Sequence, residues 1–298
     1  MKSRLIYILT YAGMWLLASL PFWALYLISD GGYLLLRYVI RYRRRVVRTN
    51  LKNSFPEKSE QELKEIEHKF YHYICDYMME EIKMLRMSFD ELARRMEYDN
   101  KEEYLAMIAK HGGIVVLIPH YANFEWLIGM GAIMREGDLP VQVYKPLHNR
   151  YMDEMFKRIR ARFGGYNIPK HSTAREMIKL RRENRHMAVG LITDQSPNLS
   201  EAHYWTTFLN QQTVFMDGGE RIAKLMNFPV FYSELQRQGR GHCKVIFDLI
   251  TETPQQMPDG AITECFVRRL EQTIRRDPPY WFWSHKRWKL KPSDTKHG

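Results

Sequence analysis

Residues 112–126 read Gly-Gly-Ile-Val-Val-Leu-Ile-Pro-His-Tyr-Ala-Asn-Phe-Glu-Trp, and this stretch decides the fold. Residues 113–118 form an apolar, largely β-branched run that opens with glycine and is closed by Pro119, which predicts a buried strand. His120 therefore lies where a strand ends. Asn123 can cap a following helix, and this would place Glu125 in the first helical turn, within reach of the imidazole.

The pairing of His120 with Glu125 suggests proton abstraction. Ligand sites in open α/β sheets lie outside the carboxyl ends of the strands. An imidazole held by a carboxylate is the usual general base near neutral pH. A histidine five residues before a glutamate also occurs by chance, so the spacing alone does not define a catalytic pair.

The rest of the chain predicts more strands, separated by helices. Apolar runs indicate strands at 141–144, 187–193, 229–235 and 243–250. Apolar residues recurring every three or four positions indicate helices at 63–85 and 152–163. Helices also fit between the later strands, at 172–184 and 218–227. This alternation predicts an α/β fold with a central, mostly parallel or mixed sheet and helices on both faces.

Polar side chains follow three of the predicted strands. Besides His120, Lys145 follows the strand at 141–144, and Asp194 and Gln195 follow the strand at 187–193. Parallel strands deliver their carboxyl ends to one edge of a sheet, so these groups are candidates for a common site. Asp194 could equally cap a turn before Pro197, and Lys145 could be an ordinary surface charge.

The N-terminus carries a candidate membrane segment. Residues 5–28 contain 24 positions without a charge, enough at about 1.5 Å per residue to cross a hydrocarbon core of about 30 Å. We expect a membrane anchor at 1–36 and a single cytoplasmic domain at 37–298. A cleaved signal peptide is the alternative, because Lys2 and Arg4 form a basic start. The apolar run is longer than a signal peptide needs, and no convincing cleavage motif follows it.

Basic residues dominate the composition. Lys and Arg number 45 against 34 Asp and Glu, which gives a net charge of +11 and a pI near 9.4. Such a balance favours acidic partners: anionic lipid, an acidic carrier protein or nucleic acid. Residues 145–185 hold twelve basic and four acidic side chains. A run of basic residues follows the anchor: Arg37, Arg41, Arg43, Arg44, Arg45, Arg48 and Lys52. By the positive-inside tendency, this run predicts that the domain lies on the cytoplasmic side. The alternative is that these residues form only a solvated helix face.

Cys75, Cys243 and Cys265 are an odd number, far apart and without a CxxC pair. This spacing argues against a disulfide framework and a zinc knuckle, so we expect reduced, buried thiols. Residues 278–288 mix aromatic side chains with Lys and Arg, which suits a membrane interface or phosphate contacts. Core packing explains those aromatic residues equally well.

Together these features resemble the lipid A biosynthesis late acyltransferases, a branch of the lysophospholipid and glycerolipid acyltransferase superfamily. The resemblance runs from the N-terminal segment to about Lys289. Its markers are Arg44-Arg45 with Asn50-Leu51, Ser54-Phe55-Pro56-Glu57, the HxxxxE motif from His120 to Glu125, Tyr144-Lys145-Pro146-Leu147 with Asn149, Asp194-Gln195, and Trp283-Ser284-His285-Lys286-Arg287-Trp288.

The resemblance implies an O-acyltransferase that moves a fatty acyl chain from acyl carrier protein to a hydroxyl of a lipid A precursor. It implies a site at the cytoplasmic face of a bacterial inner membrane, with no cofactor and no metal. His120 would be the base and Glu125 its support. Lys145 would meet the oxyanion, although the family has arginine there and lysine offers a point charge instead of a planar fork. The expected substrate-binding residues are Asn123, Asn149, Arg150, Asp194, Gln195, His285 and Arg287.

No acyl-enzyme is expected, because a thioester is already activated and the chain has no GxSxG motif. One alternative is an acyltransferase of the same superfamily that acts on an aminolipid, a glycolipid or a lysophospholipid. Another is a non-catalytic basic membrane tether. A nucleic-acid binder is disfavoured, since no recognised binding module appears.

Overall fold

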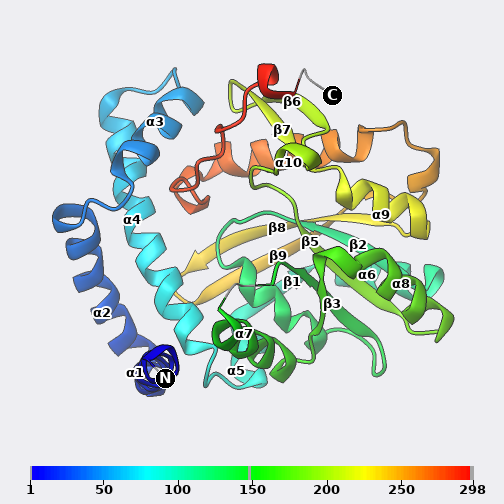
Figure 1. Cartoon of the computed structure of the whole chain (residues 1–298), viewed down its shortest axis with the longest axis horizontal. Coiled ribbons are helices and arrows are strands. Elements are labelled where there is room, and N and C mark those ends of the chain that lie inside the picture. Colours follow the sequence, from blue (N-terminus) through cyan, green and yellow to red (C-terminus); the bar gives the residue numbers. More distant parts are fainter. Residues whose placement is uncertain (1, 147–148, 296–298) are drawn as a thin grey trace.

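The computed structural model describes residues 2–146 and 149–295. Its N-terminal part is helical and lies along one side of the molecule (Figure 1). It consists of α1 (Lys2–Ser19), α2 (Phe22–Leu34), the π-helical turn η1 (Leu35–Val39), α3 (Arg44–Ser54) and the long helix α4 (Glu60–Lys83). α4 begins with a capping box, in which Ser59 and Glu62 satisfy each other's backbone N–H groups.

The single membrane-spanning helix expected from the sequence is not supported. The apolar segment divides at Leu20 and Pro21 into α1 and α2, because proline offers no N–H to continue a helix. Within residues 2–146 and 149–295, no helix combines the length and the apolar character that a bilayer crossing requires. α1 and α2 pack against α4, with Ala18, Leu25 and Tyr33 buried.

A seven-stranded sheet forms the centre, in the order β1-β9-β8-β2-β5-β3-β4. The strands are β1 (Met96–Asp99), β2 (Gly113–Ile118), β3 (Leu139–Tyr144), β4 (Tyr166–Pro169), β5 (Met187–Ile192), β8 (Val230–Gly239) and β9 (His242–Thr251). All neighbours pair in parallel except β8 and β9, which form a hairpin. The predicted α/β fold with a mostly parallel, mixed sheet is confirmed.

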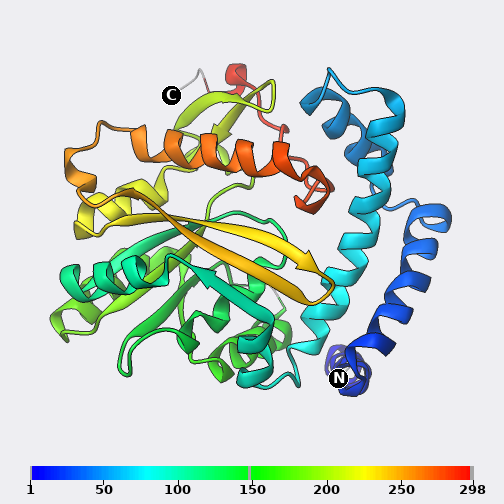
Figure 2. The ribbon, with the colours of Figure 1, turned by 180° about the vertical axis from the view of Figure 1, so that it is seen from behind.

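Helices cover both faces of this sheet. In Figure 2, α9 (Gly218–Met226) and α10 (Ala261–Arg276) lie above the strands, whereas α6 (Lys101–His111) lies below them. The 3₁₀ helix η2 (Phe124–Ala132) packs on β3, α5 (Phe89–Arg95) on β1, and α7 (Arg150–Arg162) and α8 (Thr173–Arg182) on the edge strand β4. Short 3₁₀ turns complete the chain at Lys170–Ser172, Leu199–Glu201, Pro254–Gln256, Pro278–Tyr280 and Pro292–Thr295.

The sequence did not predict the hairpin of β6 (Tyr204–Phe208) and β7 (Gln211–Phe215). Its two-residue loop consists of Leu209 and Asn210, both with positive φ. Asparagine adopts this conformation readily, but leucine does so rarely, so the loop lacked the usual glycine signal. The burial of Leu209 in the core offsets its strain.

All three cysteines are free. Cys75 and Cys243 are buried, as expected, whereas Cys265 is only half-buried. Burial raises the pKa of the Cys243 thiol to about 12, so this thiol stays protonated at neutral pH.

Candidate active site

Two adjacent parallel strands bring His120 and Asp194 together. β2 pairs with β5 through Ile118 and Ile192. His120 and Asp194 each lie two residues beyond that pair. Equal extension past a parallel register therefore places the imidazole and the carboxylate side by side at the carboxyl edge of the sheet.

The contact between them is close. His120 Nδ1 lies 2.6 Å from Asp194 Oδ1, and the backbone N–H of His120 donates to Asp194 Oδ2 at 3.0 Å. Trp281 Nε1 donates to the same Oδ2 at 2.8 Å. Burial would raise the pKa of Asp194, but the charge of His120 and these hydrogen bonds outweigh it and lower that pKa. Asp194 is therefore ionised and fixes the proton of His120 on Nδ1.

With its proton on Nδ1, His120 presents a lone pair at Nε2. Gln195 Nε2 lies 3.0 Å from that atom and donates to it. The imidazole side chain is 17% exposed, so a hydroxyl group can approach it. Phe124 and Phe282 pack edge-on against the ring, with ring centroids 4.8 and 5.8 Å away.

Glu125 does not hold His120, which corrects the expected pairing. Arg160 Nη2 donates to both oxygens of Glu125, at 3.2 and 3.3 Å. The expectation required an α-helix from Asn123. Instead, η2 is a 3₁₀ helix that starts at Phe124 and directs Glu125 toward α7. Arg160 joins the site in this way, and the sequence had indicated it only as one of many basic residues.

Asn123 does not act as the expected helix cap, and its expected role as a substrate contact remains a prediction. Its side chain makes no capping hydrogen bond to η2. It is 7% exposed, and its Nδ2 donates to the buried carboxylate of Glu80 at 2.7 Å. Asn123 therefore attaches the turn that follows His120 to Glu80 of α4.

The motif after β3 lies at the surface. Lys145 is exposed, and its charge reaches Glu201, whose pKa is lowered first by a hydrogen bond from Lys170 and less strongly by Lys145. Asn149 caps α7 by accepting from the backbone N–H groups of residues 151 and 152, and Arg150 is exposed. Leu147 lies outside the described residues. The oxyanion role of Lys145 and the substrate roles of Asn149 and Arg150 remain predictions.

The two tail residues of interest behave differently. His285 lies close to the His120–Asp194 pair. Its Nε2 accepts from the backbone N–H of Ser196, two residues after Asp194, at 3.2 Å. Arg287 is 1% exposed and donates to the carbonyl of Val214 at 2.6 Å. Burial lowers the pKa of Arg287 to about 9, and its role in substrate binding remains a prediction. Trp281, the donor to Asp194, carried no sequence signal beyond its place among clustered aromatic residues.

A small apolar cavity of about 50 Å³ lies beside the ion pair of Glu125 and Arg160. Residues of β2, η2, β3, β5 and α7 line it. Its lining includes Ile118, Leu127, Val143, Gly190 and Ile192, so its wall is mostly apolar, with Glu125 and Arg160 as its charged members. Such a wall suits an alkyl chain better than a polar ligand.

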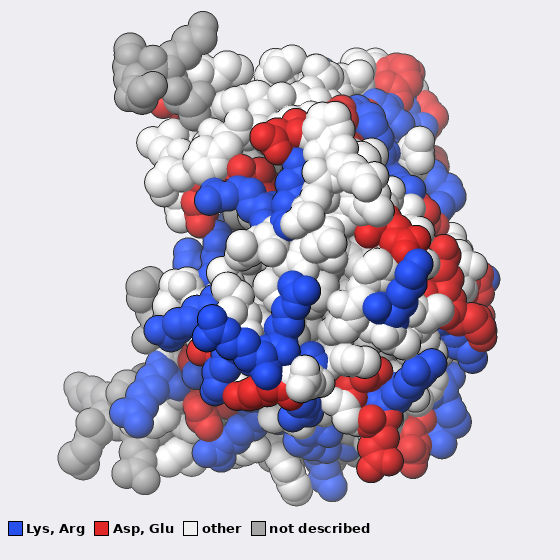
Figure 3. Space-filling view, turned by 90° about the vertical axis from the view of Figure 1, so that its right-hand side faces the viewer, with Lys and Arg blue, Asp and Glu red and all other residues white. Residues whose placement is uncertain are grey.

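Basic side chains gather on the face formed by α8 and its neighbours. Figure 3 shows a group of Lys and Arg side chains in the lower left of this view, interrupted by a few acidic ones. The exposed members on and just after α8 are Arg175, Lys179, Arg181, Arg182 and Arg185. This face would attract an acidic macromolecule.

At the carboxyl edge of this α/β sheet, a buried carboxylate orients an imidazole, and an apolar cavity lies nearby. This is the chemistry that a general-base enzyme with a lipophilic substrate requires. The chain belongs to the family of bacterial lipid A biosynthesis acyltransferases, whose model matches residues 1–290. It is also 24% identical over 295 residues to the lipid A biosynthesis lauroyltransferase of Escherichia coli (strain K12), covering 96% of this chain and 93% of that protein. Acyl transfer is therefore its reaction class.

Proposed function

We propose that this protein transfers a fatty acyl group from acyl carrier protein to a hydroxyl group of a lipid A precursor. The observation that carries the proposal is the His120–Asp194 pair, with Nε2 of the imidazole available as a base. Nε2 removes the proton of the acceptor hydroxyl once that hydroxyl displaces Gln195. Asp194 stabilises the imidazolium that forms.

The oxygen of the acceptor then attacks the thioester carbonyl directly, and the tetrahedral intermediate collapses with loss of the carrier thiolate, which takes up the proton. General-base catalysis of this kind contributes about 10² to 10⁴ in rate. Gln195 Nε2, released from His120, is a candidate donor to the oxyanion together with Lys145 from the solvent side. The apolar cavity beside Glu125 would receive part of the acyl chain.

Two surfaces support the proposed partners. α1, α2 and η1 expose many large apolar side chains, among them Trp15, Trp23, Leu27 and Val39. Arginine residues follow them directly at 41–45, and this combination favours insertion into an anionic membrane surface, parallel to its plane. The basic face of α8 suits an acidic carrier protein.

The experiment is acyl transfer by the purified full chain from an acyl carrier thioester to a lipid A precursor, with mass spectrometry of the lipid product. His120→Ala should abolish turnover and leave the protein folded, with vesicle binding unchanged. His171→Ala is the matched control, since His171 is an exposed residue on a short turn. Retained turnover in His120→Ala would overturn the mechanism.

The acceptor class is tested separately, by comparing the lipids of cells with and without this protein. Loss of one acyl group from lipid A is expected. A change confined to aminolipids, glycolipids or phospholipids would instead assign the enzyme to a different acceptor.

A further inference from the structure

The turn that carries His120 contains a strained residue. Ala122 has φ of +47°, a left-handed conformation that alanine rarely adopts. Hydrogen bonds hold its backbone on both sides: Tyr73 donates to its carbonyl at 2.7 Å, and its N–H donates to the carbonyl of Tyr280 at 2.9 Å. Strain of this kind persists only where the surroundings over-determine it.

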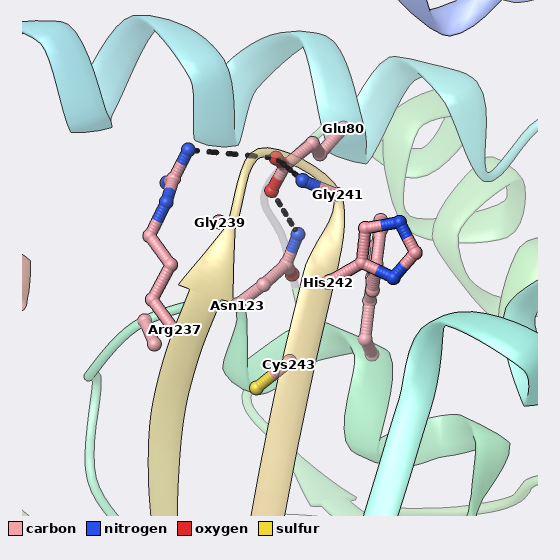
Figure 4. Close-up of a pocket in the computed structure, with 9 residues that line it drawn as sticks. Glu80, Asn123, Arg237, Gly239, Gly241, His242 and Cys243 are labelled. Carbon is pink, nitrogen blue, oxygen red and sulfur yellow. Dashed lines mark hydrogen bonds and ion pairs between the residues drawn. The ribbon is translucent and has the colours of Figure 1, made fainter.

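Glu80 of α4 provides the next restraint along the chain. Its Oε2 accepts from Asn123 Nδ2 at 2.7 Å, and its side chain is buried. Figure 4 shows Glu80 pointing from α4 toward Asn123, with Gly241 and Arg237 converging on the same carboxylate. Asn123 lies between Ala122 and Phe124, and Phe124 packs edge-on against the imidazole. One hydrogen bond therefore restrains both neighbours of Asn123.

The other oxygen of Glu80 connects this turn to distant parts of the chain. Oε1 accepts from the backbone N–H of Gly241 at 3.0 Å and from the hydroxyl of Tyr26 at 3.0 Å. Arg237 Nη2 lies 3.9 Å from it. Burial and then the charge of Glu80 raise the pKa of Tyr26, so its hydroxyl remains a donor. α2, α4, the β8–β9 hairpin and the turn that carries His120 thus meet at a single carboxylate.

We propose that Glu80 is a positioning residue, which holds Asn123 so that His120 faces the acceptor hydroxyl, and that Tyr26 makes this geometry depend on the docking of α2. The inference rests on the proposed function of His120. A buried carboxylate that accepts hydrogen bonds on both oxygens cannot move without breaking several of them. Misplacement of a catalytic group by about 1 Å costs about 10²-fold in rate.

The test reverses the donor and the acceptor in the hydrogen bond between Asn123 and Glu80. Asn123→Asp alone sets two buried carboxylates against each other and should lower kcat about 100-fold, with KM for the acceptor little changed. The double variant Glu80→Gln with Asn123→Asp restores one N–H···O contact in the reverse direction, and kcat should return to within about tenfold of the wild type. Glu65→Gln, an exposed carboxylate on the same helix, is the matched control and should leave kcat unchanged.

A second readout needs no turnover: the rate at which diethyl pyrocarbonate modifies His120, followed by peptide mass spectrometry. Modification should accelerate in Asn123→Asp and return toward the wild-type rate in the double variant. Tyr26→Phe removes only the hydroxyl on α2, which keeps the test valid if Asn123→Asp does not fold. It should lower kcat several-fold and accelerate modification.

Equal kcat and equal modification rates in the wild type, Asn123→Asp and Tyr26→Phe would overturn the inference. So would a folded double variant as impaired as Asn123→Asp. If the wild type transfers no acyl group to any acceptor, the proposed function fails. The modification rates then decide the positioning role by themselves.

Discussion

The two ring nitrogens of His120 have different partners, and only one of them can act as a base. Nδ1 is bound to Asp194, whereas Nε2 meets the amide of Gln195, a neutral group that a substrate hydroxyl can replace. The nitrogen that can act as a base is therefore Nε2, once a substrate hydroxyl has displaced Gln195. Asp194 needs no rearrangement when the imidazole becomes charged, because its second oxygen already accepts from Trp281 and from the backbone.

Asp194→Asn should lower kcat by about 10² to 10⁴, because an amide at this position no longer favours the Nδ1–H tautomer or stabilises the imidazolium. Glu125→Gln should cost at most about tenfold, since a partly exposed ion pair with Arg160 contributes about 1 kcal/mol. The measurement is steady-state kcat with KM for both substrates. An Asp194→Asn enzyme of normal kcat beside an inactive Glu125→Gln enzyme would restore Glu125 as the partner of His120.

The sequence identified His120, Asp194 and Gln195 as residues that follow strands, but it could not pair them. His120 and Asp194 are 74 positions apart in the chain, and they meet only because β2 and β5 are neighbours in the folded sheet. Strand order is a property of the whole sheet and leaves no trace in local spacing. Spacing therefore favoured the nearer carboxylate, Glu125, which the structure pairs with Arg160.

His285 predicts a pH dependence of stability. Burial, followed by the charges of Arg287, His120 and Lys289, lowers the pKa of His285 to about 4 against the opposing effect of Asp194. The unfolded chain binds this proton near pH ~6.5, so between about pH 6.5 and 4 it holds more protons than the folded chain. Stability must therefore fall as pH falls through this window.

The check is the unfolding temperature of the wild type and of His285→Gln between about pH 7 and 4.5, which spans most of that window. The variant should show the shallower loss, because glutamine can still accept from Ser196 but cannot bind a proton. His171→Gln, a change of an exposed histidine, should follow the wild type. Parallel curves for all three proteins would contradict the prediction.

At the scale of elements, strand and helix types were predictable where periodicity was strong. β2, β3, β5, β8 and β9 all lie at expected positions, and so do α7, α8 and α9. Two features depended on tertiary contacts instead. Leu209 adopts positive φ because the core buries it, and η2 forms a 3₁₀ helix packed against β3 where an α-helix was expected.

The apolar cavity makes a prediction about acyl-chain length. Gly190 on β5 lines it, and a Cβ added there would lie 2.9 Å from Ile118 Cδ1. Gly190→Ala should therefore narrow the cavity and shift the preference toward shorter acyl chains, with an overpacking cost of about 1 to 3 kcal/mol. Competition between thioesters of different chain length, read by mass spectrometry, measures the shift.

Gly218→Ala is the control for this change, because a Cβ at Gly218 would meet nothing within 4 Å. It should keep the wild-type chain-length profile. An unchanged profile in a folded Gly190→Ala enzyme would show that the acyl chain binds elsewhere.

At the scale of the whole molecule, the N-terminal helices place an apolar surface beside the α/β sheet. Trp23 is 69% exposed and Leu27 is 64% exposed on α2, the same helix whose Tyr26 contacts Glu80. Large apolar side chains gathered on one surface indicate that another molecule or a lipid layer covers it. The arginine residues that follow favour an anionic bilayer.

Trp23→Ser and Leu27→Ser should each weaken binding of the full chain to anionic vesicles. Burial of such a side chain contributes about 1.5 to 3 kcal/mol, so each change should raise the vesicle Kd by about 10- to 100-fold. Leu225→Ser is the matched control, since Leu225 is 55% exposed on α9, away from the N-terminal helices. Co-sedimentation with vesicles of stated anionic content, at low and high salt, gives the Kd. If Leu225→Ser weakens binding as much as the α2 variants do, or if neither α2 variant changes it, α2 is not the docking surface. Membrane binding would then not affect the position of His120 through Tyr26.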